Sequence, residues 1–279
     1  VALALGVLAA WRGIDGLRVD GGKLAIVLAG AAAIHVLGLV DDLKNIRARW
    51  KLLAQVLVAL AVALAGVRVE QLSLPFVGVI EFNAITGTLF TVLWLVAITN
   101  AFNLIDGLDG LASGAAMFAL TTMFVVATIN GIAGAAMVTI LLAGATLGFL
   151  FYNFHPATIF LGDSGSLFLG FMLAGIGLLS SEKVPTVVAV AIPVAALRLP
   201  VLDTALAIVR RFLRGQPIFT ADSNHIHHRL LGLGHSPKQV ALLLYGVCAL
   251  LPLGGMVLVT DGYYVALVPG LLARGVGQA

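Results

Sequence analysis

The chain of 279 residues is 61% hydrophobic and only 10% charged, with a formal net charge of +3. Soluble domains average about 25% charged residues, so these charged side chains are too few to cover a soluble surface, and a disordered chain would need the opposite composition. The abundance of Leu, Ala, Val and Gly favours helices over a transmembrane barrel, which alternates apolar and polar residues. We therefore predict an all-α polytopic membrane protein whose basic residues reflect topology and not nucleic-acid binding.

Ten apolar stretches are candidates for crossing a bilayer, which takes roughly 20 residues. In chain order they are 1–11, 24–40, 52–67, 88–104, 111–129, 132–151, 166–181, 186–209, 239–259 and 263–273. The first begins at Val1 in the middle of an apolar run, without the charged segment of a signal peptide, so we expect an N-terminal span to be missing. We treat residues 1–279 as a single domain.

Alternation of these spans assigns every connection to one of two membrane faces. One face receives 41–51, 105–110, 152–165, 210–238 and the C-terminus and carries ten Lys and Arg residues, against five on the other. The positive-inside rule makes the first face cytoplasmic. The connection 68–87 alternates apolar and polar residues around Pro75 and Gly78, which predicts a short external β-hairpin.

Six of the ten aspartates and five of the six histidines fall on the face predicted to be cytoplasmic. A purely solubilising role would scatter them, so their concentration predicts a polar site at the inner membrane surface. They are Asp41, Asp42, Asp106, Asp109, Asp163, Asp222, His155, His225, His227, His228 and His235.

The pair Asp41-Asp42 ends one apolar stretch. Carboxylates at a helix C-terminus oppose the helix dipole, so the pair requires a compensating cation, for which Lys44, Arg47 and Lys51 are candidates. The alternative is a simple solvated helix end.

Asn100, Asn103, Asp106 and Asp109 follow one another at intervals of three. Residues three apart are neighbours on a helix, so this set predicts contacts to a metal-bound phosphate or a nucleotide. The alternative is a polar helix end with glycine caps.

A third polar segment, around Gly162-Asp163-Ser164-Gly165, precedes another apolar stretch. A turn followed by a capping serine would explain Ser164, but it explains Asn153 and His155 less well. The lone His35 within a span is predicted to be a packing residue.

The segment His225-Ile-His227-His228-Arg229 offers imidazoles that suit zinc, but the oxygen-rich side chains elsewhere favour Mg²⁺. Imidazole and guanidinium together also suit phosphate binding. Within the span 186–209, Arg198 and Asp203 form either a structural or a functional pair. The alternative function is a membrane transporter, in which Arg198 and Asp203 would form a relay at the midplane and the helices would be broken at Pro193 and Pro200.

Four segments together resemble the bacterial polyprenyl-phosphate N-acetylhexosamine-1-phosphate transferase family, in its N-acetylglucosamine-1-phosphate branch. They are GLVDDL at 38–43, NAFNLIDGLDGLA at 100–112, FYNFHPATIFLGDSGSLFLG at 151–170 and PIFTADSNHIHHRL at 217–230. The resemblance implies transfer of a HexNAc-1-phosphate from a UDP-sugar to undecaprenyl phosphate, with release of UMP. It also implies Mg²⁺, or Mn²⁺ in its place, and a site on the cytoplasmic face of the bacterial cytoplasmic membrane. The product would start synthesis of a cell-envelope polysaccharide such as lipopolysaccharide or teichoic acid, and a homodimer is left open.

The same resemblance implies roles for individual residues. Asp163 would ligate the metal, and the catalytic carboxylates would be Asp41, Asp42, Asp106 and Asp109. The residues implied to bind substrate are Asn103, Asn153, Lys44, His225, His227, His228 and Arg229. Whether a member of the pair Asp41-Asp42 accepts a residual proton or forms a covalent phosphosugar intermediate stays open.

Overall fold

The computed structural model describes residues 21–74, 78–129, 131–181 and 230–246. This part of the chain is mostly helical, and residues 237–246 are helical as well. The six labelled helices are α2 (Gly21–Lys44), α3 (Ala48–Leu64), α4 (Ala84–Ile105), α5 (Leu111–Ile129), α6 (Ala133–Asn153) and α7 (Gly162–Ser181). Each corresponds to one predicted apolar stretch. The stretches 1–11, 186–209 and 263–273, and most of 239–259, lie outside the described residues.

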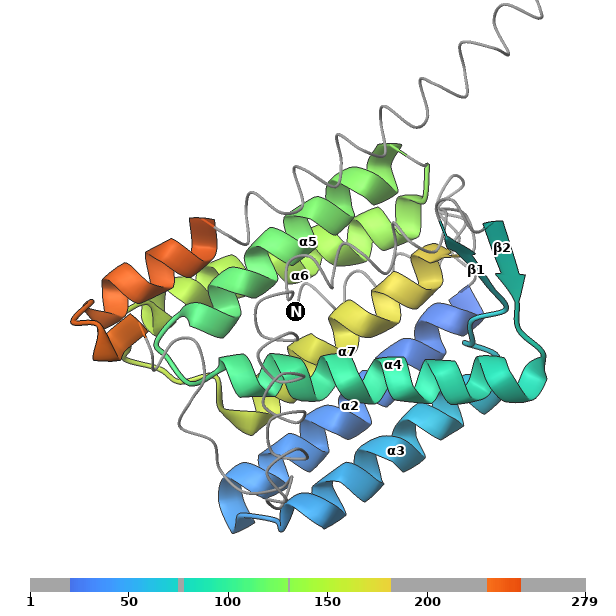
Figure 1. Ribbon diagram of the computed structural model, residues 1–279, viewed down its shortest axis with the longest axis horizontal. Coiled ribbons are helices and arrows are strands. Elements are labelled where there is room, and N and C mark those ends of the chain that lie inside the picture. The colour runs from blue at the N-terminus through green and yellow to red at the C-terminus, as the bar shows by residue number, and fades with distance from the viewer. Residues whose placement is uncertain (1–20, 75–77, 130, 182–229, 247–279) are drawn as a thin grey trace, which may run out of the picture.

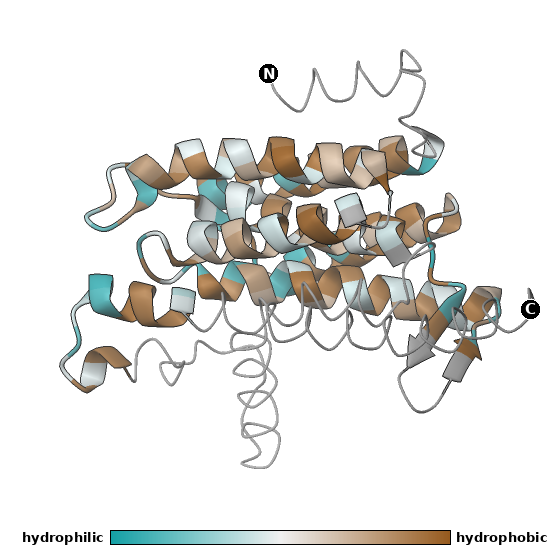
Figure 2. Cartoon of the chain, turned by 90° about the horizontal axis from the view of Figure 1, so that it is seen from above, coloured by the Kyte–Doolittle hydropathy of each residue, from teal (hydrophilic) through white to brown (hydrophobic). Residues whose placement is uncertain are grey.

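Five of these helices are long and apolar enough to cross a membrane: α2, α4, α5, α6 and α7. The remaining helix, α3, is mostly apolar but is shorter, with 17 residues. Apolar residues run along the lengths of the helices, and polar residues gather at the connections (Figure 2). The chain is therefore a multi-pass membrane protein.

Two short strands lie at one end of the helices (Figure 1). β1 (Gln71–Leu74) and β2 (Gly78–Glu81) pair antiparallel, with Gln71 opposite Glu81, while residues 75–77 between them lie outside the described part. The backbone N–H of Val69 donates to Oγ1 of Thr91 at 2.9 Å, which ties this region to α4. The placement of the strands on the external side stays a prediction.

α4 and α7 begin four residues before their predicted starts, and a side chain caps each of them. The side chain of Asn83 accepts from the backbone N–H groups of Ile85 and Thr86 at 3.0 and 2.9 Å, so α4 begins at Ala84. Such caps satisfy amides that have no partner within the helix. α7 begins at Gly162 and is capped from a different helix, through Asp42.

Close packing at glycines brings α7 against α2 and α4. A Cβ atom at Gly38 would lie 2.5 Å from the carbonyl oxygen of Asp163, and one at Gly170 would lie 2.9 Å from Cα of Thr99. Small residues allow helix backbones to approach closely within membranes. The ends of α2 and α4 are thus held beside the start of α7, where the predicted site residues lie.

Candidate active site

The connections 45–47, 106–110 and 154–161 meet at the end of the helices opposite the strands (Figure 1). The C-terminal ends of α2, α4 and α6 therefore lie beside the N-terminal ends of α3, α5 and α7. The sequence predicted this shared side. Of the fourth predicted connection, 210–238, the structure describes only residues 230–238.

Asp41 and Asp163 are joined by one lysine. Nζ of Lys51 lies 2.7 Å from Oδ2 of Asp41 and 2.5 Å from Oδ2 of Asp163. Asp41 is only 8% exposed, and its Oδ1 accepts from the backbone N–H of Ile46 at 2.6 Å. Of the three cations that the sequence offered to compensate the aspartate pair, Lys51 therefore makes the contact with Asp41, whereas Lys44 is exposed in the last turn of α2.

Asn103 fixes the other oxygen of Asp163. Its Nδ2 donates to Oδ1 of Asp163 at 2.9 Å and to Oγ of Ser166 at 2.8 Å. The Ser166 hydroxyl in turn donates to the carbonyl oxygen of Gly162 at 2.8 Å. Asp163 is thereby held by side chains from α3 and α4, and Ser166 of α7 orients the Asn103 amide. We call Asp41, Lys51, Asn103, Asp163 and Ser166 the charged cluster.

Asp42 caps the start of α7. Its Oδ1 accepts from the N–H of Asp163 at 2.8 Å, and its Oδ2 from that of Ser164 at 3.0 Å. A carboxylate that is unfavourable at the end of α2 is thus favourable at the positive end of another helix. Gly162 has a φ of +65°, and a Cβ there would lie 2.9 Å from Oδ2 of Asp42, so a glycine is needed at this contact.

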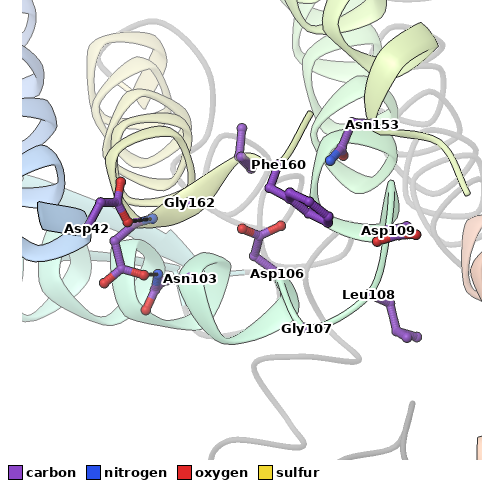
Figure 3. Close-up of a pocket in the computed structure, with 11 residues that line it drawn as sticks. Asp42, Asn103, Asp106, Gly107, Leu108, Asp109, Asn153, Phe160 and Gly162 are labelled. Carbon is purple, nitrogen blue, oxygen red and sulfur yellow. Dashed lines mark hydrogen bonds between the residues drawn. The ribbon is translucent and has the colours of Figure 1, made fainter. Parts of the chain in front are cut away.

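A cavity of about 370 Å³ opens beside Asp163. Figure 3 shows Asp106 directed into it, with the ring of Phe160 between Asp106 and Asn153. Phe160 is 71% exposed, so its ring is accessible to lipid, a ligand or a partner. The lining residues are Asp42, Asn103, Asp106, Gly107, Leu108, Asp109, Asn153, Phe160, Leu161, Gly162 and Asp163.

Asp106 does not continue the helical row that the sequence predicted. α4 ends at Ile105, and Gly110 has a φ of +75°, so Asp106 and Asp109 lie in a connection and not on the helix face of Asn103. Burial, together with the negative charges of Asp163 and Asp42, raises the pKa of Asp106 from 3.8 to about 7. The cavity therefore carries negative charge that a cation would neutralise.

Asp109 and Asn153 hold the connection 154–161 in place. Oδ2 of Asp109 lies 2.8 Å from Nδ1 of His155 and accepts from the N–H of Ala157 at 3.1 Å, and these contacts lower the pKa of Asp109. Asn153 is 2% exposed. Its Oδ1 accepts from the Ser113 hydroxyl at 2.6 Å, and its Nδ2 donates to the carbonyl oxygen of Ile159 at 3.0 Å. Both side chains thus shape the wall that carries Phe160.

The structure brings most predicted site residues together and adds others. Asp41, Asp42, Asn103, Asp106, Asp109, Asn153 and Asp163 lie at one end of the helices, whereas His225, His227, His228 and Arg229 lie outside the described residues. The site predicted from the sequence did not include Lys51, Ser166, His155 or Phe160, although Lys51 was considered as a counter-ion for the aspartate pair.

His35 has the predicted packing role. Its Nδ1 lies 3.1 Å from the carbonyl oxygen of Ser164, and its ring meets the edge of Phe168 with centroids 5.9 Å apart. It therefore contributes to the contact between α2 and α7.

The donor set fits Mg²⁺ bound jointly with a substrate phosphate. Within the described ranges, no group of three or more His, Cys, Asp or Glu residues is arranged to hold a metal ion by itself. Mg²⁺ is usually held by one or two carboxylates, with waters and substrate phosphates as the other ligands. Asp163 and the carboxyl groups of Asp42 and Asp106 line one cavity, which matches that mode of binding.

Comparison with known proteins places the chain in a family. The model of "Glycosyl transferase family 4" matches residues 24–181. A Bacillus subtilis protein named "Probable undecaprenyl-phosphate N-acetylglucosaminyl 1-phosphate transferase" is 40% identical over 246 residues, which cover 88% of this chain and 68% of that protein. The Mycobacterium tuberculosis "Decaprenyl-phosphate N-acetylglucosaminephosphotransferase" is 38% identical over 245 residues, covering 80% of this chain and 60% of the relative.

A more distant relative is the "Phospho-N-acetylmuramoyl-pentapeptide-transferase" of Desulforudis audaxviator, which is 32% identical over 271 residues that cover 90% of this chain and 77% of that protein. The chain thus spans 68% of the Bacillus relative and less than two thirds of the mycobacterial one. The family match covers every residue of the charged cluster and of the cavity lining. The chain belongs to glycosyl transferase family 4.

Proposed function

We propose that this protein transfers N-acetylglucosamine-1-phosphate, or a related HexNAc-1-phosphate, from a UDP-sugar to undecaprenyl phosphate and releases UMP. The observation that carries the proposal is the position of the cavity: acidic side chains and an exposed aromatic ring lie at one end of five membrane-length helices. A lipid phosphate and a water-soluble nucleotide can meet there. The names of the relatives support both the sugar and the lipid acceptor.

The main difficulty of the reaction is the repulsion between two anionic phosphate groups and not the removal of a proton. The phosphate monoester of the lipid is mostly dianionic near neutral pH, because its second pKa is about 6. One of its oxygens forms a bond to the β-phosphorus of the UDP-sugar, and the bond from that phosphorus to the bridging oxygen breaks as UMP leaves. Mg²⁺, when bound, supplies positive charge that offsets the repulsion between the two anions, and Mn²⁺ is the alternative ion.

The described residues take distinct parts in this proposal. Asp163 is the metal ligand, oriented by Lys51 and Asn103. Asp106 faces the same cavity with a pKa of about 7, which suits it to take up a residual proton from the attacking phosphate. Asp41 and Asp42 stand beside the metal and the lipid phosphate.

The nucleotide is proposed to lie against the connections 106–110 and 154–161. The exposed ring of Phe160 offers a face on which a base can stack, and Asp109 and Asn153 hold that ring in place through their own connections. His225, His227, His228 and Arg229 are proposed to hold the diphosphate.

We propose that the polar end faces the cytoplasm of the bacterial cytoplasmic membrane, with the paired strands outside and about ten spans in the whole chain. The Lys and Arg residues of 41–51 favour that orientation. A transporter is less well supported, because it would concentrate polar residues near the midplane. The described polar site lies at the helix ends instead. A homodimer remains a proposal.

UMP release tests the activity. Membranes that contain the protein and undecaprenyl phosphate should release UMP from UDP-N-acetylglucosamine or a close UDP-HexNAc, and a panel of UDP-sugars identifies the preferred one. Membranes without undecaprenyl phosphate are the control. UMP release that does not depend on the lipid, or no release from any UDP-HexNAc, would contradict the proposal.

A further inference from the structure

The helical segment 237–246 reaches the cavity-forming connections through Tyr245. The Tyr245 hydroxyl donates to the carbonyl oxygen of Gly110 at 2.5 Å. Gly110 is the last residue of the connection 106–110, which contributes four lining residues to the cavity. Tyr245 itself is not among the lining residues, so any effect it has on a ligand is indirect.

The ring of Tyr245 packs directly against Gly114, which has no side chain. A Cβ at Gly114 would lie 2.0 Å from Cζ of Tyr245, so only glycine admits the ring at this place. The rings of Phe118 and Phe154 pack against it, with centroids 5.8 and 6.5 Å away. Phe154 precedes His155 in the second cavity connection, so Tyr245 contacts both connections that form this side of the cavity.

The carbonyl oxygen of Gly110 also takes part in the first turn of α5, where it accepts from the backbone N–H of Gly114 at 2.8 Å. In the same turn, the Ser113 hydroxyl donates to Oδ1 of Asn153 at 2.6 Å, and Asn153 donates to the carbonyl oxygen of Ile159, next to Phe160. The hydrogen bond from Tyr245 to Gly110 therefore also orders the first turn of α5, from which Ser113 contacts Asn153.

We infer that Tyr245 is a positioning residue for the nucleotide-sugar side of the cavity. This inference rests on the proposed function. Through Gly110 and Phe154, Tyr245 contacts the connections that carry Asp106, Asp109 and Phe160. A residue that positions these connections should affect use of the UDP-sugar more than use of the lipid, whereas a residue that merely stabilises the fold should affect both alike.

The substitution Tyr245→Phe tests this, because it removes the hydroxyl and keeps the ring. We expect KM for the UDP-sugar to rise about 2- to 12-fold, the range for loss of one net hydrogen bond. KM for undecaprenyl phosphate should stay within about 2-fold, because the contacts of Tyr245 to Gly110 and Phe154 lie on the nucleotide-sugar side. Ser113→Ala should shift the same parameter in the same direction. Tyr152→Phe, at an exposed tyrosine on α6, is the matched control and should change neither KM.

The outcomes separate the inference from the function on which it rests. Equal changes in both KM values, or a lower thermal stability with unchanged KM for the UDP-sugar, would overturn the positioning role. If Tyr245→Phe does not fold, Ser113→Ala decides the same question through binding of UDP-N-acetylglucosamine to purified protein. Absence of lipid-dependent UMP release by the unsubstituted protein would contradict the proposed function instead.

Discussion

The charged cluster and the connection 106–110 both present aspartates to the cavity, but they hold them in opposite ways. Asp41 and Asp163 share the ammonium group of Lys51, and Asp163 also accepts from Asn103. Asp106, only a few residues beyond Asn103, is partly buried near the carboxylates of Asp163 and Asp42, so its pKa rises to about 7.

This difference follows from the supporting elements. The charged cluster is built by helices, whose register fixes each side chain against a neighbouring helix. The aspartates of 106–110 lie beyond the end of α4, where their position depends on glycine conformation and on contacts with the next connection. We therefore expect the cluster to set whether the reaction occurs, and the connection to set how the nucleotide binds and how stability responds to pH.

The largest expected effect comes from breaking the cluster at Asp163. Asp163→Asn keeps the shape of the side chain but removes the charge that would hold Mg²⁺. UMP release should fall about 10²- to 10³-fold, as for loss of one electrostatic contact in an active site. The measurement is lipid-dependent UMP release across a Mg²⁺ titration.

Glu70→Gln is the matched control, because Glu70 pairs with Arg68 at 3.5 Å beside the strands, away from the cavity. It should leave UMP release unchanged. Full activity of Asp163→Asn, or full activity of the unsubstituted protein in chelator, would remove Asp163 and the metal from the proposed mechanism.

Much of this arrangement was predictable from the sequence, because helix spans depend on apolar length and sidedness depends on alternation. The span 111–129 matches α5 residue for residue, and the shared side of the aspartates follows from counting spans. The starts of α4 and α7 were not predictable in the same way. Asn83 caps its own helix. In contrast, α7 is capped by Asp42, 120 residues earlier in the chain, and the length of an apolar stretch does not indicate a contact with such a distant residue.

The pairing of charges also lay beyond sequence reasoning. Lys44, Arg47 and Lys51 are all close to Asp41 in sequence, and only the packing of α3 beside α2 selects Lys51. Phe160 was overlooked because an aromatic residue among apolar neighbours is typical of a core. Its exposure becomes visible only when the connection that carries it is placed.

A second prediction tests which lysine belongs to the cluster. Lys51→Met leaves Asp41 and Asp163 facing each other without a cation, which should lower the free energy of unfolding by about 2–4 kcal/mol and reduce UMP release. Lys44→Met, at an exposed position of α2, should change stability by less than about 0.5 kcal/mol. Thermal unfolding in detergent and UMP release measure both. A larger loss of activity in Lys44→Met than in Lys51→Met would support the prediction that Lys44 binds substrate and contradict the role of Lys51 in the cluster.

The smallest and most selective effect concerns the two aspartates of the connection. The folded-state pKa of Asp106 is raised from 3.8 to about 7. Between those values the unfolded chain has lost the proton that the folded protein keeps, so the wild-type free energy of unfolding falls as pH rises. Asp109 has a lowered pKa, because it accepts from Ala157 and His155. Its contribution is therefore present above 3.8 and is lost as pH falls through its folded-state pKa.

Replacing Asp106 or Asp109 by asparagine should consequently change the free energy of unfolding in opposite directions. At about pH 8, Asp106→Asn should raise the free energy of unfolding by about 1–3 kcal/mol, because the amide imitates the protonated acid, and this gain should shrink toward about pH 5. Asp109→Asn should lower it by about 1 kcal/mol at about pH 8, since the amide weakens the bonds to His155 and Ala157. Thermal unfolding in detergent with chelator, at both pH values, measures the two variants side by side. The same sign for both, or a gain in Asp106→Asn that does not depend on pH, would show that charge does not distinguish these aspartates and that the contrast between cluster and connection lies in packing alone.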